Sequence, residues 1–189
     1  MTDSKDQEFV KDFENKVHDT IFGYLQREDK IDSHVPECID VEECWAEIAR
    51  DYLPDGVREF EKYPVVSLGW MMFIGMAMAK LWDDDWMKFS KERDFYNKIK
   101  NKRGFDNLDE AVLYDFLRYE GEGADKENAV VQDCAARVLS QLQHNNIEPS
   151  TDIAFGCYVA ALHQLYLSGM AMELKNLGYK MTLFTPNLN

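Results

Sequence analysis

The densest run of reactive side chains in the sequence is Trp82-Asp83-Asp84-Asp85-Trp86, which places three carboxylates between two indoles. Clustered carboxylates suit hard cations such as Ca²⁺. Successive residues of a helix point about 100° apart, so three consecutive aspartates cannot chelate one ion unless the helix breaks there. We therefore expect a junction between two helices, capped by aspartate and with a tryptophan packed on either side. This interpretation assigns no metal to the run.

Two weakly charged segments each carry one residue that could anchor a polar ligand. His163 lies close to Tyr166 in the later segment, and Lys80 follows Met76 by four residues in the earlier one. A buried histidine usually bonds a carbonyl or a hydroxyl of the core, but it can also hold a ligand in a cavity. The stem of Lys80 can lie on apolar surface while its ammonium group reaches the neighbouring aspartates. His163, Lys80, Met76 and Tyr166 are the ligand-binding candidates.

The same two segments hold six of the nine methionines of the chain. Methionine fills irregular cores and also lines adaptable hydrophobic sites. The core interpretation is favoured, because a binding stripe needs exposure and both segments look interior. The six residues are Met71, Met72, Met76, Met78, Met170 and Met172.

Motifs for common catalytic chemistry do not occur in this sequence. It lacks a phosphate-binding Gly-Lys loop, an H-E-x-x-H pair and a G-x-S-x-G elbow. It also lacks the paired Glu-x-x-His motifs of a di-iron carboxylate bundle. We therefore expect no cofactor and assign no catalytic residue.

Positive charge is concentrated between positions 88 and 103, where seven basic residues face two acidic ones. This stretch carries a net charge of +5 within a chain of -14, so the remainder carries -19. A charge run is usually a solvated helix face. The alternative is a patch that docks on an acidic surface of a partner or a second copy. Its interaction candidates are Lys98, Lys100, Lys102 and Tyr96, with Ile99 as a further apolar contact.

The net charge, the polar N-terminus and the uncharged run 65–79 indicate which partners and which cellular location to expect. A net charge of -14 repels phosphate at long range, so we expect no nucleic-acid partner. The polar first six residues show no apolar signal segment, which predicts a cytoplasmic protein. The uncharged run 65–79 is shorter than the roughly 20 residues of a membrane span, so we expect a buried core helix and no membrane.

Apolar residues recur at spacings of three and four, and no segment alternates as a strand does. We therefore expect an all-α bundle of six to seven helices with the two apolar helices at its centre. The expected breaks include one at Pro54-Asp55-Gly56, whereas Trp86 to Lys102 is expected to form one continuous helix.

The tetrapeptide Gly75-Met76-Ala77-Met78 recurs at positions 169–172, an offset of 94 that is close to half the chain. This repeat suggests a duplication into three-helix halves, residues 1–94 and 95–189, within a single all-α domain of residues 1–189. A chance match among buried helices is the alternative. If the duplication is real, the glycines would let the two apolar helices approach closely.

Two functions from different classes remain open on this sequence. The first is a non-enzymatic, acidic interaction module that binds another protein or itself, suggested by the missing catalytic motifs and the opposed charge blocks. The second is a helical small-ligand binder or enzyme with a pocket between the two apolar helices near His163. An acidic protein that mimics nucleic acid also fits the charge.

Overall fold

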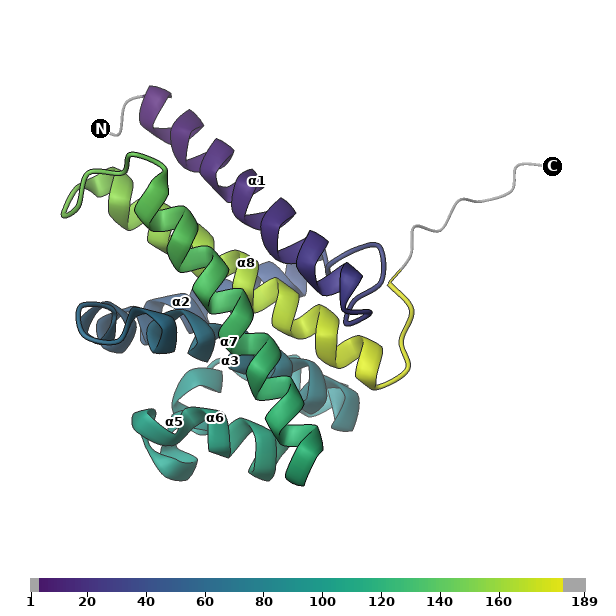
Figure 1. Ribbon diagram of the computed structural model, residues 1–189. Helices are drawn as coiled ribbons and strands as arrows, with labels where there is room; N and C mark the ends of the chain where they lie inside the picture. The colour runs from purple at the N-terminus through teal and green to yellow at the C-terminus, as the bar shows by residue number, and fades with distance from the viewer. Residues whose placement is uncertain (1–3, 182–189) are drawn as a thin grey trace.

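The computed structural model describes residues 4–181, and these residues form eight α-helices and no strand. The predicted all-α bundle is confirmed (Figure 1). Five long helices build most of it: α1 (Ser4–Arg27), α2 (Ile39–Phe60), α3 (Pro64–Asp84), α7 (Gly121–His144) and α8 (Asp152–Asn176). Shorter elements connect α3 to α7: α4 (Trp86–Phe89), α5 (Phe95–Arg103), the 3-10 turn η1 (Phe105–Asn107), α6 (Leu108–Glu110) and the π-helical turn η2 (Ala111–Phe116).

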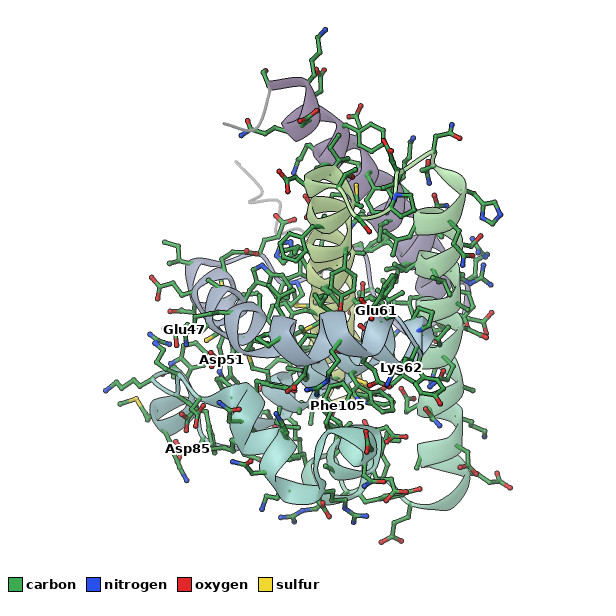
Figure 2. All side chains as sticks on the ribbon, turned by 90° about the vertical axis from the view of Figure 1, so that its left-hand side faces the viewer. Glu47, Asp51, Glu61, Lys62, Asp85 and Phe105 are labelled. Atoms are coloured by element: carbon green, nitrogen blue, oxygen red, sulfur yellow. The ribbon has the colours of Figure 1, made fainter. Side chains whose placement is uncertain are left out.

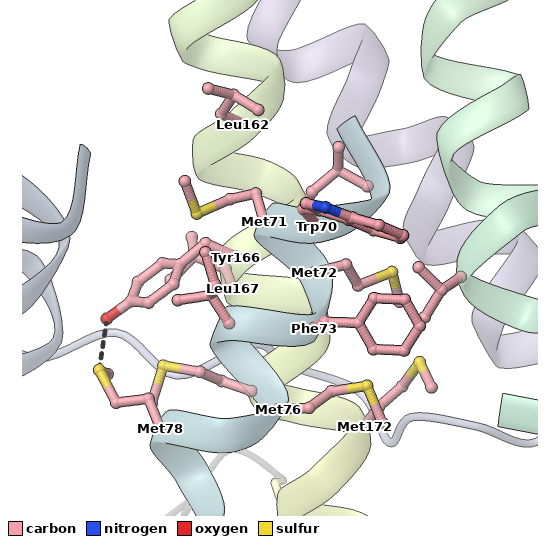
Figure 3. Packing of buried hydrophobic residues seen from close by; sticks show 14 of the residues in the cluster. Trp70, Met71, Met72, Phe73, Met76, Met78, Leu162, Tyr166, Leu167 and Met172 are labelled. Carbon is pink, nitrogen blue, oxygen red and sulfur yellow. Dashed lines mark hydrogen bonds between the residues drawn. The ribbon is translucent and has the colours of Figure 1, made fainter. Parts of the chain in front are cut away.

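The two apolar helices, α3 and α8, lie at the centre of the bundle and pack most extensively on each other. Neither helix has a polar face wide enough to meet water, so burial on all sides is the stable solution. Figure 3 shows the methionines and aromatic rings that fill the space around their crossing. The core interpretation of these methionines is confirmed, because all six are buried.

Two glycines allow the backbones of α3 and α8 to touch. A Cβ atom added at Gly75 would lie 2.2 Å from the carbonyl oxygen of Tyr166, and one added at Gly169 would lie 2.1 Å from that of Met72. Positions 72 and 166 are separated by the same 94 residues as the two glycines. The glycine of each repeated tetrapeptide thus makes an equivalent contact with the backbone of the other helix, while duplication of the flanking helices stays a prediction.

The outer helices cover this central pair from different sides. Helix α1 packs on α8, α7 packs on α3, and α2 lies against α3 with α5 beside it. The start of α1 and the turn between α7 and α8 lie at the same end of the bundle (Figure 1). Figure 2 shows α2 crossing in front of α8, with Glu47 and Asp51 on one side of the crossing and Glu61, the residue after the end of α2, on the other.

The expected helix break at Pro54-Asp55-Gly56 is wrong, because α2 continues through these residues to Phe60. Proline removes one backbone donor, which tertiary contacts can offset. Here the hydroxyl of Tyr52 donates to the Ser67 carbonyl oxygen at 2.5 Å, and Ser67 Oγ donates to the carbonyl oxygen of Gly56 at 2.7 Å. These buried hydrogen bonds fix α2 on α3 across the proline.

The single helix expected from Trp86 to Lys102 is also wrong, since α4 ends at Phe89 and α5 begins at Phe95. Glu92 makes the turn between them by accepting the backbone N–H groups of Arg93 and Asp94 at 3.1 and 3.0 Å. The junction predicted at the aspartate run is confirmed, since α3 ends at Asp84 and the side chain of Asp85 caps α4. The expected packing of a tryptophan on either side is wrong, because Trp82 and Trp86 meet edge-on with ring centroids 4.8 Å apart.

Helices α3 and α8 are each long and apolar enough to cross a membrane by length and composition. In this bundle, however, 78% of the most apolar window of α3 and 67% of that of α8 are buried inside the protein. Burial of this extent is typical of the core helices of a bundle.

Candidate functional site

His163 on α8 is held between two carboxylates from different helices. Its Nδ1 lies 3.0 Å from Glu14 Oε1 on α1, and its Nε2 lies 3.1 Å from Glu42 Oε1 on α2. The ring also packs against Trp45, with the ring centroids 4.9 Å apart. A carboxylate can only accept, so both ring nitrogens donate when both contacts are made, which requires the imidazolium form.

The charges of this cluster stabilise one another. Burial alone would lower the pKa of His163, but the hydrogen bond to Glu14 and the negative charge of Glu42 raise it overall. The bond to His163 lowers the pKa of Glu14 to about 2, against the opposing effect of burial. Gln164 adds a donor to Glu14 at 2.9 Å. His163 therefore ties α1 and α2 to α8, the role of a structural clamp.

The other ligand-binding candidates occupy different places. Lys80 forms an ion pair with Asp84 one turn along α3. Met76 is fully buried, and the buried Tyr166 donates its hydroxyl to the Val41 carbonyl oxygen at 3.0 Å. None of five surface pockets formed by residues 4–181 is lined by any of the four candidates. His163 and Tyr166 both pack against the Trp45 ring, with ring centroids 4.9 and 5.4 Å from it.

The basic run folds back on the protein's own carboxylates. Lys98 pairs with Glu92 at 2.5 Å, and Lys100 pairs with Asp55 of α2 at 2.5 Å. Lys102 is exposed and forms no ion pair within the described part of the chain.

The expectation that Tyr96 and Ile99 offer an exposed apolar contact is wrong. Tyr96 is 1% exposed and Ile99 is fully buried. The Tyr96 hydroxyl donates to Asp55 at 2.5 Å, and its ring meets Tyr52 edge-on. The apolar side of α5 is covered because its phenylalanine, tyrosine and isoleucine follow helical spacing and face α2 and α3.

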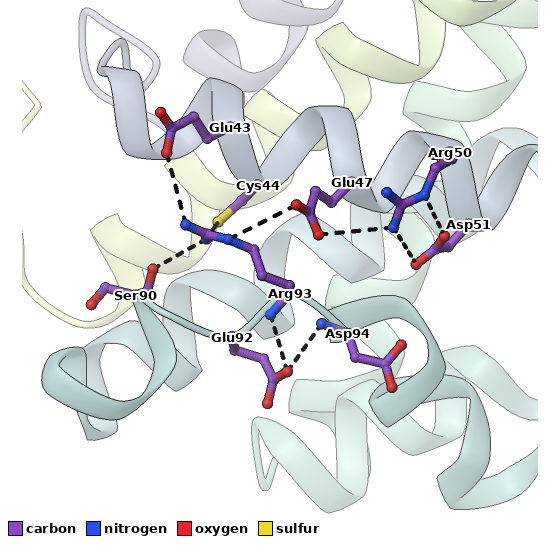
Figure 4. Close-up of polar contacts among 9 residues, drawn as sticks. All are labelled: Glu43, Cys44, Glu47, Arg50, Asp51, Ser90, Glu92, Arg93 and Asp94. Carbon is purple, nitrogen blue, oxygen red and sulfur yellow. Dashed lines mark hydrogen bonds and ion pairs between the residues drawn. The ribbon is translucent and has the colours of Figure 1, made fainter.

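Arg93 extends the same internal pairing to the first half of α2 (Figure 4). Its guanidinium nitrogens lie 3.8 Å from Glu43 and 3.9 Å from Glu47, and one approaches Cys44 Sγ at 3.9 Å. The acidic α2 thus pairs with two residues of the basic run, Arg93 and Lys100.

A different part of the molecule exposes apolar side chains together. At the end where α8 begins, Phe155 is 50% exposed, Val57 40% and Phe9 38%. These residues come from α8, α2 and α1. We call this region the α8 end surface, defined by Phe9, Val57, Phe60, Ile147, Ile153 and Phe155.

Three adjoining grooves shape the α8 end surface. The first lies between Val57 and Phe60 of α2 and the start of α8, with a volume of about 380 Å³. The second lies between α1 and α8, and the third lies between Phe9 and the turn that precedes α8. Phe155 lines the first two grooves, and Ile153 lines the second and third. The apolar side chains therefore form one continuous hollowed surface.

The floor of the first groove is held in place by hydrogen bonds. Tyr158 lines the groove, and its hydroxyl lies 2.6 Å from the buried Ser67 Oγ of α3. The ring of Tyr158 packs on Phe60, with centroids 4.9 Å apart. Since α2, α3 and α8 all meet at this point, the groove has a fixed shape.

The rim of the α8 end surface is acidic. Asp6, Glu61, Glu148 and Asp152 line the grooves, and none of them forms an ion pair with another of the described residues. The one lining lysine, Lys11, lies 3.6 Å from Glu14, which also lines the second groove.

Sequence reasoning selected none of the residues of this surface. The signal that was present is local: Ile147 and Ile153 flank the Pro149-Ser150-Thr151 turn, where a solvated loop would carry polar residues. Phe9, Val57 and Phe60 come from distant segments, so no spacing rule could join them to the turn.

In comparisons with known proteins, no family model, no curated protein and no solved structure matches the chain.

Proposed function

We propose that this chain is a non-enzymatic protein-interaction module that binds a partner protein through the α8 end surface. The observation that carries the proposal is the joining of Phe9, Val57 and Phe155, from three helices, into one hollowed and half-exposed apolar surface. Apolar patches with a polar rim are typical of interaction sites. Phe155 has a half-exposed aromatic ring, and aromatic residues are enriched in protein interfaces relative to the rest of the surface.

A fixed shape supports the same function. The hydroxyl contact between Tyr158 and Ser67 and the packing of Phe60 hold the first groove in one conformation. A surface that is ordered before binding loses less conformational entropy when the partner arrives.

The alternative, a small-ligand binder or enzyme with a pocket near His163, has less support. Both ring nitrogens of His163 already face carboxylates, and a ligand would have to displace them. At Gly75 and Gly169 the backbones of α3 and α8 are in direct contact, which leaves no room for a ligand at the crossing.

The setting we propose is the cytoplasm, with a protein partner and neither nucleic acid nor membrane. Support comes from the net charge of -14, which disfavours approach to polyphosphates and anionic lipids. An outside partner is favoured over a second copy, because Lys98, Lys100 and Arg93 already pair within the chain.

The test compares proteins captured by the wild type, Phe155→Asp and Tyr114→Asp. Tyr114 is a matched control because it is 43% exposed on η2, outside the α8 end surface. We expect a partner that the wild type and Tyr114→Asp retain and Phe155→Asp loses, with unchanged circular dichroism in all three. A partner lost by Tyr114→Asp and kept by Phe155→Asp would refute the assignment.

A further inference from the structure

We infer that the partner presents a basic amphipathic helix to the α8 end surface. This inference rests on the proposed interaction function and adds the chemistry of the partner. It combines the apolar grooves beside Phe155 with the excess of carboxylates around them.

The apolar half of the argument is geometric. Phe155 lines both the groove toward α2 and the groove toward α1, so it forms a ridge between two hollows. Two side chains one turn apart on a helix project from the same face. An amphipathic helix can therefore straddle Phe155 and place one large apolar side chain on each side, the common helix-in-groove mode of recognition.

The charged half of the argument concerns the rim. Glu61, Glu148 and Asp152 are exposed, and no described basic residue pairs with them or with Asp6. Unpaired carboxylates around an apolar centre complement a helix whose polar face carries lysine or arginine. They also repel acidic partners, which adds selectivity.

The start of α8 does not provide a competing anion site. A helix N-terminus carries a partial positive charge that attracts anions. Here Thr151 Oγ1 already accepts the N–H of Ala154 at 3.1 Å, and Asp152 places a carboxylate in the first turn. The field at the grooves is therefore set by the carboxylates.

The test uses three synthetic helical peptides of equal length and labels each with a fluorophore. One has a leucine and phenylalanine stripe with a lysine face, the second has glutamate in place of lysine, and the third is a scramble of the first. Binding is measured by anisotropy against the full-length protein at low and high salt. We expect the basic amphipathic peptide to bind and the other two to bind at least about tenfold more weakly, with the difference reduced by salt.

Variants locate the bound peptide. Phe155→Ala should weaken binding about tenfold or more, as for an aromatic anchor. Each of Glu61→Gln and Glu148→Gln should weaken it roughly two- to fivefold, as expected for an exposed ion pair. Tyr114→Ala and Glu110→Gln, an exposed pair on and beside η2, serve as controls and should bind like the wild type.

The two proposals fail in different ways. If the glutamate-faced peptide binds as well as the lysine-faced one, or if Phe155→Ala leaves binding unchanged, the basic-helix inference is overturned. If no peptide binds, it is also overturned. The interaction function is tested separately by the capture experiment. It is still supported after any of these peptide results if Phe155→Asp loses a captured partner that Tyr114→Asp retains.

Discussion

Glu173 is a carboxyl group that the fold holds almost completely out of water. It is 1% exposed and lies one turn beyond Gly169 on α8. Burial raises its pKa to about 7, and the negative charge of Glu127 adds to this, whereas hydrogen bonds from Tyr119 and Asn176 lower it. The Tyr119 hydroxyl donates to Glu173 at 2.6 Å. At low pH this site holds a neutral acid, which is the form that a buried position favours.

The raised pKa of Glu173 predicts a loss of stability as pH rises. Between the ordinary pKa of 4.5 and about 7 the unfolded chain releases a proton that the folded protein still binds, so unfolding becomes easier. The loss is about 3 kcal/mol in all. Glu173→Gln should remove most of it, leaving the variant more stable than the wild type at pH 8.

Urea unfolding at pH 5 and pH 8 measures this effect. Glu122→Gln, an exposed position of α7, is the control and should follow the wild type at both values. A Glu173→Gln variant with the same loss between pH 5 and pH 8 as the wild type would refute the prediction.

His163 gives a pH dependence of the same sign as Glu173, although here the charged form is the one that the folded protein stabilises. Its folded pKa is raised above 6.5, so its pairs with Glu14 and Glu42 are complete below pH 6.5 and are lost as pH rises through the folded pKa. We expect His163→Gln to cost about 1–3 kcal/mol at pH 6 and less at pH 9. Thermal unfolding of the variant beside His144→Gln, an exposed histidine, tests this. An equal cost at both pH values would show that the histidine acts through packing alone.

At the scale of elements, the contact between α3 and α8 depends on two glycines, Gly75 and Gly169, which have no side chain. Gly75→Ala would place a Cβ atom 2.2 Å from the Tyr166 carbonyl oxygen, where neither backbone can yield without separating the helices. We expect a cost of about 1–3 kcal/mol or more from this overpacking. Gly123→Ala is the matched control, because nothing lies within 4 Å of its Cβ position in α7. It should stabilise the helix by about 0.5–1 kcal/mol. Chemical denaturation of both variants measures the two changes in unfolding free energy, and a Gly75→Ala variant as stable as the wild type would contradict the prediction.

Helices with strong patterns were predictable from the sequence. Helices α1, α3 and α8 follow from apolar spacing and from uncharged length, because burial needs those patterns whatever the neighbours are. The continuation of α2 through Pro54 was not predictable, because it depends on Ser67, a residue of another helix. Local signals cannot include such tertiary contacts.

The candidate site was beyond prediction for a related reason. Phe9, Val57 and Phe155 lie far apart in the sequence, and only the packing of α1, α2 and α8 brings them to one surface. His163 was recognised as a polar residue on an apolar helix, but its partners Glu14 and Glu42 come from two other helices. Long-range geometry decides which polar residue acts as a clamp and which is available for binding.

At the scale of the whole molecule, the basic stretch serves first to neutralise the acidic chain from within. Lys100 is tied to Asp55, which also accepts from Tyr96 and pairs with Arg58, so α5 and α2 are joined by charge as well as by apolar packing. The hypothesis that this stretch drives self-association requires lysines that are free to leave such pairs. Among the three candidates, Lys102 is the exposed one without an ion pair in the described chain.

Charge reversal at two positions separates these roles. Lys100→Glu puts a second carboxylate beside the half-buried Asp55, so it should destabilise the protein by about 1–3 kcal/mol. Lys102→Glu should change stability by no more than about 0.5 kcal/mol, as for an exposed residue. Urea unfolding measures both, and sedimentation at low and high salt should show the wild type and both variants as monomers. If the wild type is instead an oligomer that Lys102→Glu dissociates without loss of stability, the basic helix is an interface between copies. In that case a second copy, and not an outside partner, accounts for the exposed Lys102.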